Sequence, residues 1–296
     1  MNHRLSRRRF LQFAGIALAA NSIDWLFPSG LSAMFSARGR ALHKVPMHAR
    51  PEAQAPQVDS LWPDSVHELK WYDGQWLRVA NGYARQTSFQ PLLNLQPPAS
   101  FGFSELPGWV EVIAPIVAIR QYCAPYAPIW GRIGHGALLW IERSLRVDGG
   151  MLWLKSAAGW LPAVHVRPVE IAPPQRQAGF AEIFVDKRHN RLLAIQDGKT
   201  VFELACRLPN TLPTVATVTS QHPASVRRDG GSIYPGAPWY IELGPGSGAI
   251  SGVYWHHEVG PGAGVATSGD IELPVIGARV LYRWTQAFGL VKLRLI

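Results

Sequence analysis

Five side chains that can act as acids, bases or metal ligands lie within one short stretch near the C-terminal end of the chain. The stretch is SGVYWHHEVGPGAGVATSGDIEL, residues 251–273, and the five are His256, His257, Glu258, Asp270 and Glu272. A β-prone run ends in an aromatic–histidine cluster, and a glycine-rich loop leads back into an apolar run, which is the layout of an active-site segment. None of its residues is an obvious nucleophile, so any chemistry here would use carboxylates or a metal.

The two carboxylates near the end of this stretch are spaced for one kind of acid–base chemistry. Asp270 and Glu272 are two residues apart, so on a strand they would face the same side, about 6 to 7 Å from each other. That separation falls near the range for paired-carboxylate glycoside hydrolysis. Alternating charges on an exposed strand face give the same spacing, so an exposed strand is the competing interpretation.

The same stretch could also surround a metal ion, with His257, Glu258 and Asp270 as weak candidate ligands. Neighbouring histidines on a strand point to opposite faces, so at most one of His256 and His257 would join Asp270. The competing interpretation makes His256 a packing and hydrogen-bonding residue beside Trp255. We therefore expect no bound metal and no other cofactor.

Short β-prone runs surround this stretch and would hold it in place. Residues 181–209 contain three such runs, and Asp197-Gly198 between the second and third is a strong hairpin signal. PWYIEL and GAISGVYW supply two more runs, and GLVKLRLI closes the chain as a strand. PVIGARVLYRWTQ, residues 274–286, predicts a helix, because proline suits the first turn and apolar residues recur at helical spacing.

Two similar segments precede a proline- and glutamine-rich break at residues 172–179. One ends in GGMLWLKSAAGWLPAVHVRPV and the other in QWLRVANGYARQTSFQPL, and both endings resemble the closing hairpin of bacterial SH3-like domains. The matching positions are Trp153, Gly159 and Trp160 in the first and Trp76, Gly82 and Tyr83 in the second. They predict an internal repeat, whose tryptophans would belong to the core more often than to a ligand site.

The composition favours a folded protein with many turns. Of the 296 residues, 47% are apolar and 17% charged, and 28 glycines, 24 prolines and 12 tryptophans suit a mostly β architecture with aromatic packing. Residues 1–40 hold six arginines and one aspartate, which leaves +4 of the net charge of +9 for the rest of the chain. This mild excess does not indicate nucleic-acid binding and suits a weak attraction to an anionic cell envelope.

Residues 1–40 are predicted to be an export signal. SRRRFLQ, residues 6–12, matches the twin-arginine signal, and the apolar run FAGIALAA after it is too short to span a bilayer. We therefore predict export by the twin-arginine pathway to the cell envelope or outside the cell, with membrane retention by an uncleaved signal as the alternative. Export permits a disulfide between Cys123 and Cys206, although these fall in different predicted domains and in no metal-ligand pattern.

The segment from Ala181 to Ile296 resembles the catalytic domain of the L,D-transpeptidases, which cross-link bacterial peptidoglycan. IFVDKRHNRLLAIQDGKTVFELACRLPN parallels the first hairpin of that family, and YPGAPWYIEL parallels a segment in which Pro-Trp precedes a central strand. AISGVYWHHEVG parallels A-x-H-G-T-Y-W-H-x-x-F-G, and TSGDIEL parallels S-H-G-C-x-N before the helix with LYRWT. The resemblance implies a β-sandwich-like domain with one helix at 180–296, preceded by small SH3-like barrels at 41–95 and 107–170.

The resemblance also implies which residues would do chemistry, and those residues are replaced. Such enzymes use a cysteine thiolate as the nucleophile, a histidine as the base and backbone N–H groups for the oxyanion. Asp270 occupies the cysteine position, Ser251 and Ser268 the histidine positions, and Thr267 the serine position. No cysteine follows Cys206, and an aspartate is a far weaker acyl acceptor than a thiolate.

We therefore expect a catalytically degenerate L,D-transpeptidase-like envelope protein that binds peptidoglycan stem peptides or a cell-wall protein. The predicted binding groove consists of Trp239, Gly252, Tyr254, Trp255, His256 and Gly269. The alternatives are an active peptidoglycan L,D-transpeptidase and an enzyme with rebuilt carboxylate or metal chemistry in the same groove. A buried Asp270 with a convergent partner in a pocket would favour chemistry, whereas an Asp270 that only caps backbone N–H groups would favour binding. A groove filled by its own loop, residues 260–266, would indicate a structural remnant.

Overall fold

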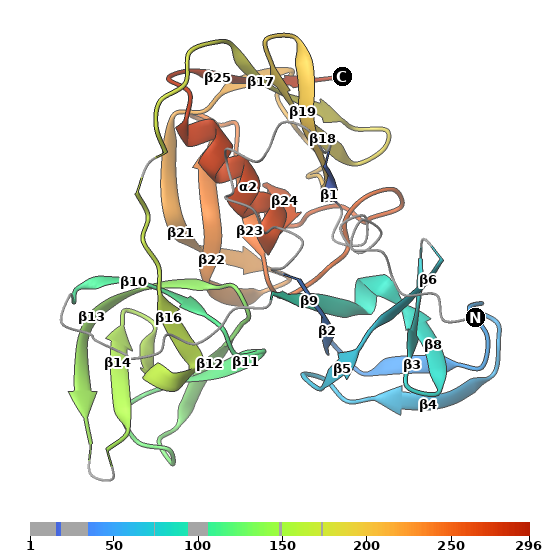
Figure 1. Cartoon of the computed structure of the whole chain (residues 1–296), viewed down its shortest axis with the longest axis vertical. Helices are drawn as coiled ribbons and strands as arrows, with labels where there is room; N and C mark the ends of the chain where they lie inside the picture. Colours follow the sequence, from blue (N-terminus) through green and yellow to red (C-terminus); the bar gives the residue numbers. More distant parts are fainter. Residues whose placement is uncertain (1–15, 19–34, 74, 94–105, 148–149, 173) are drawn as a thin grey trace.

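The computed structural model describes residues 16–18, 35–73, 75–93, 106–147, 150–172 and 174–296. Strands dominate these residues, and their one α-helix, α2 (Val275–Gln286), lies in the C-terminal part (Figure 1). The prediction of a mostly β protein with one helix is therefore confirmed. The predicted twin-arginine motif lies outside the described residues. Within them, no helix has both the length and the apolar character needed to cross a membrane.

The first unit contains short antiparallel strands around a small core of its own. One sheet has the order β4-β3-β8-β7-β6, and in a second sheet β2 lies between β5 and β9. The strands are β2 (Phe35–Ala41), β3 (Val45–His48), β4 (Gln57–Leu61), β5 (Val66–Glu68), β6 (Lys70–Asp73), β7 (Trp76–Val79), β8 (Gly82–Arg85) and β9 (Phe89–Leu93). Because β2 begins inside the segment assigned to the export signal, Arg40 belongs to the folded unit.

The second unit forms one sheet with the order β12-β11-β15-β14-β13-β10-β16. Its strands are β10 (Gly108–Val112), β11 (Ile116–Arg120), β12 (Ile129–Gly134), β13 (Leu138–Arg146), β14 (Leu152–Ser156), β15 (Gly159–Pro162) and β16 (Val166–Pro168). Among the described strands of both units no ring of pairings closes, so the sheets are open where the sequence predicted barrels.

The two segments that the sequence paired as a repeat fold in the same way. Each is an antiparallel hairpin, β7–β8 in the first unit and β14–β15 in the second, in which Gly82 pairs with Val79 and Gly159 with Ser156. Each hairpin is followed by a single 3₁₀ turn and then a strand. Trp76 is buried in the first hairpin and Trp153 in the second, which fits the expectation that they are core residues.

The C-terminal unit places α2 between two sheets (Figure 1). Trp284 of α2 contacts Phe202 of the first sheet with ring centroids 5.6 Å apart, and Tyr282 contacts Trp239 of the second at 5.3 Å. The first sheet has the order β1-β19-β18-β17-β25-β20 and the second β21-β22-β23-β24. Their strands are β1 (Ile16–Leu18), β17 (Ala181–Asp186), β18 (Arg191–Gln196), β19 (Lys199–Ala205), β20 (Val215–Thr217), β21 (Ser220–Asp229), β22 (Ser232–Glu242), β23 (Ala249–Val253), β24 (Ile271–Pro274) and β25 (Val291–Leu295).

Buried polar contacts join the C-terminal unit to both upstream units. Arg40 of the first unit donates to Asp64 at 2.7 Å, to Gln90 at 2.9 Å and to the Tyr254 carbonyl of the C-terminal unit at 2.7 Å. Glu111 of the second unit is fully buried and pairs with Arg279 of α2. A buried charge is costly without a partner, so these pairs hold the three units in defined positions.

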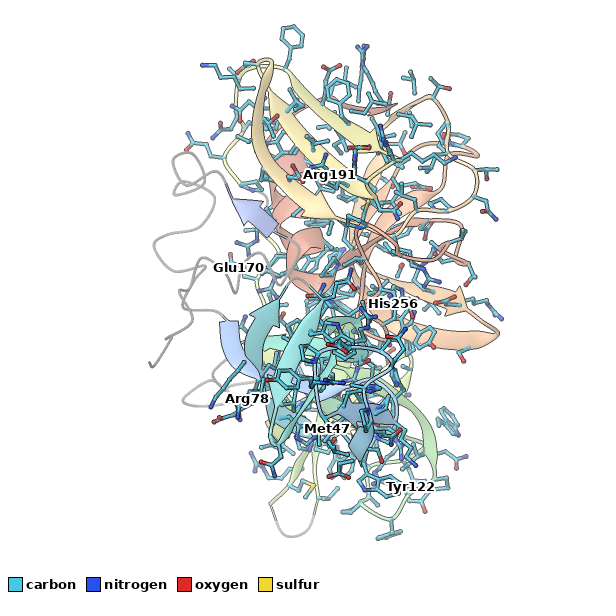
Figure 2. The ribbon with its side chains drawn as sticks, turned by 90° about the vertical axis from the view of Figure 1, so that its right-hand side faces the viewer. Met47, Arg78, Tyr122, Glu170, Arg191 and His256 are labelled. Carbon is cyan, nitrogen blue, oxygen red and sulfur yellow. The ribbon has the colours of Figure 1, made fainter. Side chains whose placement is uncertain are left out.

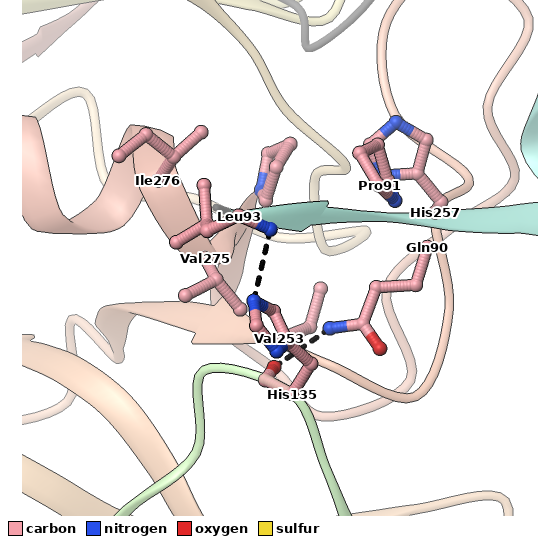
Figure 3. Close-up of a pocket in the computed structure, with 9 residues that line it drawn as sticks. Gln90, Pro91, Leu93, His135, Val253, His257, Val275 and Ile276 are labelled. Carbon is pink, nitrogen blue, oxygen red and sulfur yellow. Dashed lines mark hydrogen bonds between the residues drawn. The ribbon is translucent and has the colours of Figure 1, made fainter. Parts of the chain in front are cut away.

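His135 lies where all three units meet (Figure 3). Its Nε2 accepts the Leu93 N–H at 2.9 Å, so the ring is neutral with a proton on Nδ1, which lies 3.0 Å from the Ile113 carbonyl oxygen. Burial lowers the pKa of His135 from 6.5 to about 4. The cavity beside it measures about 20 Å³ and is mostly apolar, which leaves room for one water molecule. This junction is a packing site and too small for a substrate.

Candidate functional site

The parallel pairing of β23 with β24 brings the two motifs of the stretch 251–273 together. Ser251 lies opposite Glu272 in the register, and Asp270 directly precedes β24. Gly252 is required by the close approach of β22, because a Cβ there would lie 2.8 Å from the Pro238 carbonyl oxygen. The two paired strands thus bring Ser251, Asp270 and Glu272, which the sequence singled out, close together.

Asp270 is 4% exposed and is used to hold the structure together. Its Oδ1 accepts the Ala249 N–H at 3.0 Å, and its Oδ2 forms an ion pair with Arg227 of β21. Arg227 also donates to the Ser268 carbonyl at 3.3 Å. With one oxygen on the backbone and the other on an arginine, the Asp270 carboxylate is a structural link between β21 and the start of β24.

Glu272 is fully buried and has a separate set of partners. It accepts the Ser268 hydroxyl at 2.7 Å, lies 3.0 Å from His256 Nε2 and 3.6 Å from Arg207. The backbones of Arg207 and Glu272 also exchange two hydrogen bonds of 2.9 Å. Neither carboxylate lies on an exposed strand face, so the exposed-strand interpretation is wrong. Both carboxylates are engaged by donors of the chain itself, which does not favour a hydrolytic pair.

Asp229 is the acidic residue of this site that sequence reasoning missed. It ends β21 at the tip of the β21–β22 hairpin and accepts the Trp255 indole N–H at 3.0 Å and the Thr267 hydroxyl. In the sequence it is only the first residue of an Asp-Gly-Gly turn. No local pattern shows that this turn folds over the segment that contains His256 and Glu272.

Asp229, His256 and Glu272 offer ligand atoms that all lie within 4.8 Å of one another. A histidine with two carboxylates is a donor set that zinc accepts. Of the predicted ligands, His257 is buried beside the small junction cavity and Glu258 is exposed, so neither belongs to this group. Each member already has a hydrogen-bond partner within the chain, so the cluster is satisfied without an ion.

The predicted aromatic wall of the groove is largely part of the core. Trp239 packs between Tyr282 and Arg279, and burial raises the pKa of Tyr254, whose hydroxyl donates to the Pro235 carbonyl at 2.8 Å. Trp255 alone of the three is partly exposed, and it stacks on Tyr234 with ring centroids 4.2 Å apart. Figure 2 shows the neighbouring His256 at the level where the C-terminal unit meets the upstream units.

The glycine-rich loop folds back against the end of β19. Gly260 donates its N–H to the Cys206 carbonyl and Ala266 to the Leu208 carbonyl, both at 2.9 Å. Arg207 further donates to the Gly264 carbonyl at 3.3 Å. Gly269, the remaining predicted groove residue, has a φ of 80°, a conformation that favours glycine. The loop is therefore held against residues 206–208, which follow β19.

The thiol of Cys206 is not available as a nucleophile. Cys206 and Cys123 are not bonded to each other, and Cys206 is buried. Burial raises the pKa of the Cys206 thiol far above its ordinary value, and a protonated, inaccessible thiol is inert.

The comparisons with known proteins give distant structural similarity only. No protein-family model and no curated protein matches the chain. The catalytic domain of an L,D-transpeptidase from Enterococcus faecium aligns with 17% identity and a TM-score of 0.32, covering 40% of this chain and 99% of that one. An L,D-transpeptidase from Mycobacterium tuberculosis aligns with 10% identity and a TM-score of 0.35, covering 70% and 90%. An L,D-transpeptidase from Stackebrandtia nassauensis aligns with 17% identity and a TM-score of 0.32, covering 41% of this chain and 58% of that one.

Proposed function

We propose that this chain is a non-catalytic protein of the cell envelope that binds peptidoglycan or a protein of wall synthesis. The observation that carries the proposal is the state of Asp270, which stands where the motif resemblance places the cysteine nucleophile. Its carboxylate is buried between the Ala249 N–H and Arg227. A group held in this way cannot attack a carbonyl carbon, and the buried thiol of Cys206, whose pKa is raised by burial, cannot replace it.

The positions of the missing histidines support the same conclusion. Ser251 is buried in β23, and the Ser268 hydroxyl donates to Glu272 at 2.7 Å. Neither side chain is a general base at neutral pH. The twin-arginine motif supports export, so we place the protein in the envelope or outside the cell, with an uncleaved signal as a possible membrane anchor.

A pull-down on purified, insoluble peptidoglycan tests the proposal, combined with mass spectrometry for new stem-peptide cross-links. We expect the full chain to be retained and no cross-links to form. Trp255→Ala should weaken retention, because Trp255 is the one predicted wall residue with exposed ring surface. Trp62→Ala is the matched control, since Trp62 is 74% exposed in the first unit. New cross-links would overturn the non-catalytic assignment. Absence of retention would overturn the binding of peptidoglycan and leave a protein of wall synthesis as the partner.

Rebuilt metal chemistry is a second candidate function, and the convergence of Asp229, His256 and Glu272 is the observation in its favour. Titration of the full chain with Zn²⁺ alone separates the two functions. Saturable, one-to-one binding that His256→Ala abolishes would favour the metal enzyme. No binding above that of the His256→Ala chain would favour the non-catalytic protein.

A further inference from the structure

A cleft of about 680 Å³ separates the second unit from the β21–β22 hairpin. Strands of the second unit form one wall and the two hairpin strands the other, and these elements lie next to each other in Figure 1. Gly236 lets the walls meet at the base of the cleft, because a Cβ there would lie 2.5 Å from the Leu138 carbonyl oxygen. The cleft lies within the range of 300–1,000 Å³ that is typical of ligand sites.

Indole rings with free faces line the wall of the second unit. Trp130 is 62% exposed and Trp140 is 44% exposed, and Trp109 meets Trp140 edge-on with centroids 5.4 Å apart. The hairpin wall presents Val226 and Ile233, which are also exposed. Exposed apolar surface gathered in one concavity is characteristic of an interaction site. Other tryptophans of the chain, such as Trp153, Trp239 and Trp284, are buried completely.

Two charged side chains in the cleft are free to bind a ligand, and one hydroxyl beside them is unpaired within the part of the chain that the structure describes. Arg132 and Glu142 are exposed and make no side-chain hydrogen bond or ion pair with another described residue. The Ser225 Oγ is buried and has no hydrogen-bond partner among the described residues. The cation Arg132 and the anion Glu142 give both donors and acceptors without a net charge.

We propose that this cleft binds an uncharged saccharide chain. A pyranose ring has a flat C–H face that stacks on an indole, and its rim of hydroxyl groups both donates and accepts hydrogen bonds. Trp130 and Trp140 supply the stacking surfaces, and Arg132 and Glu142 supply the hydrogen bonds. An acidic peptide would instead require an excess of cations in the cleft, and the cleft has one of each sign.

The inference goes beyond the proposed function, because neither Asp270 nor its partner Arg227 lines the cleft. Arg227 pairs with Asp270, whereas the preceding hairpin residue, Val226, lines the cleft. The two sites can therefore be tested separately by substitution.

Isothermal titration of the full chain with a hexamer of β-1,4-linked N-acetylglucosamine tests the inference. We expect saturable binding that is about tenfold weaker, or about 1.4 kcal/mol, in each of Trp130→Ala and Trp140→Ala. Trp62→Ala should bind like the unmodified chain. Because the rings of Trp130 and Trp140 are exposed, both variants should fold, and an unchanged melting temperature verifies this.

Any one of three results would overturn the inference. The first is that the hexamer does not bind, and the second is that it binds equally to all variants. The third is that a sugar-free peptide binds through Trp130 and Trp140 instead of the hexamer. The proposed function fails by a different result, because retention on peptidoglycan that depends on Trp255 can persist in the Trp130→Ala chain. Retention without hexamer binding would therefore remove this inference and leave the proposed function standing.

Discussion

The ion pair between Asp270 and Arg227 should stabilise the C-terminal unit, and Asp270→Asn isolates its contribution. Asparagine keeps the size of the side chain and an oxygen that can accept the Ala249 N–H, which lies 3.0 Å from the carboxylate. The substitution therefore removes only the charge opposite Arg227. The side chains are 5% and 16% exposed, and loss of one partner of a buried pair costs about 3–5 kcal/mol. The partial exposure of Arg227 places the expected loss near the lower end, at about 3 kcal/mol.

A double-mutant cycle measures the pair itself. Arg227→Met alone leaves the Asp270 carboxylate without its cation, and the double variant leaves neither charge. We expect a coupling energy of about 2–3 kcal/mol, measured by urea unfolding with tryptophan fluorescence. The surface pair Glu182–Arg294, whose side chains are 29% and 49% exposed, is the control, and Glu182→Gln should cost less than about 1 kcal/mol. A coupling energy near zero would refute the structural role of Asp270, because it would show that Arg227 does not hold the carboxylate in place.

Two further predictions concern the junctions between the units. Because burial lowers the pKa of His135 from 6.5 to about 4, the unfolded chain takes up the proton first, and folding stability falls as the pH drops from 6.5 to 4. The loss of folding free energy reaches about 3 kcal/mol. Unfolding measured at several pH values should show this loss in the unmodified chain and not in His135→Gln. Equal dependence of stability on pH in the two chains would contradict the prediction. Gly236→Ala should destabilise the chain more than Gly246→Ala, by about 1–3 kcal/mol. Both glycines have a φ near 72°, and only at Gly236 would the Cβ meet another atom, the Leu138 carbonyl oxygen; equal melting temperatures would contradict the clash.

Local patterns predicted the elements of the C-terminal unit. The helix expected at 274–286 is α2 (Val275–Gln286), since its proline start and apolar spacing are local signals. Asp197 and Gly198 adopt φ values of 50° and 79° between β18 and β19, as a type I′ hairpin requires. The closing strand was also expected and is β25 (Val291–Leu295). In each of these cases the information lies within a few neighbouring residues.

The partners of the site could not be predicted in this way. Arg227 and Asp229 belong to the β21–β22 hairpin and reach Asp270 and Thr267 only through tertiary folding. The burial of Trp239 likewise depends on α2, which covers one face of β22. The motif resemblance placed the candidate positions together, but whether a position faces a ligand or the core depends on packing between elements far apart in the sequence.

Under the proposed function, the aspartate at the motif's nucleophile position and the burial of that position are physically linked. An aspartate in place of a thiol puts a carboxylate at a position that is 4% exposed, and such a charge is tolerable only with a nearby cation. Arg227 supplies that cation, and the ion pair connects β21 to the residue directly before β24. Returning a cysteine to position 270 would then leave a largely buried guanidinium without its anion, next to a thiol whose base positions are Ser251 and Ser268. In the proposed non-catalytic protein, the absence of transpeptidase chemistry is therefore a property of the packed hairpin as well as of one residue.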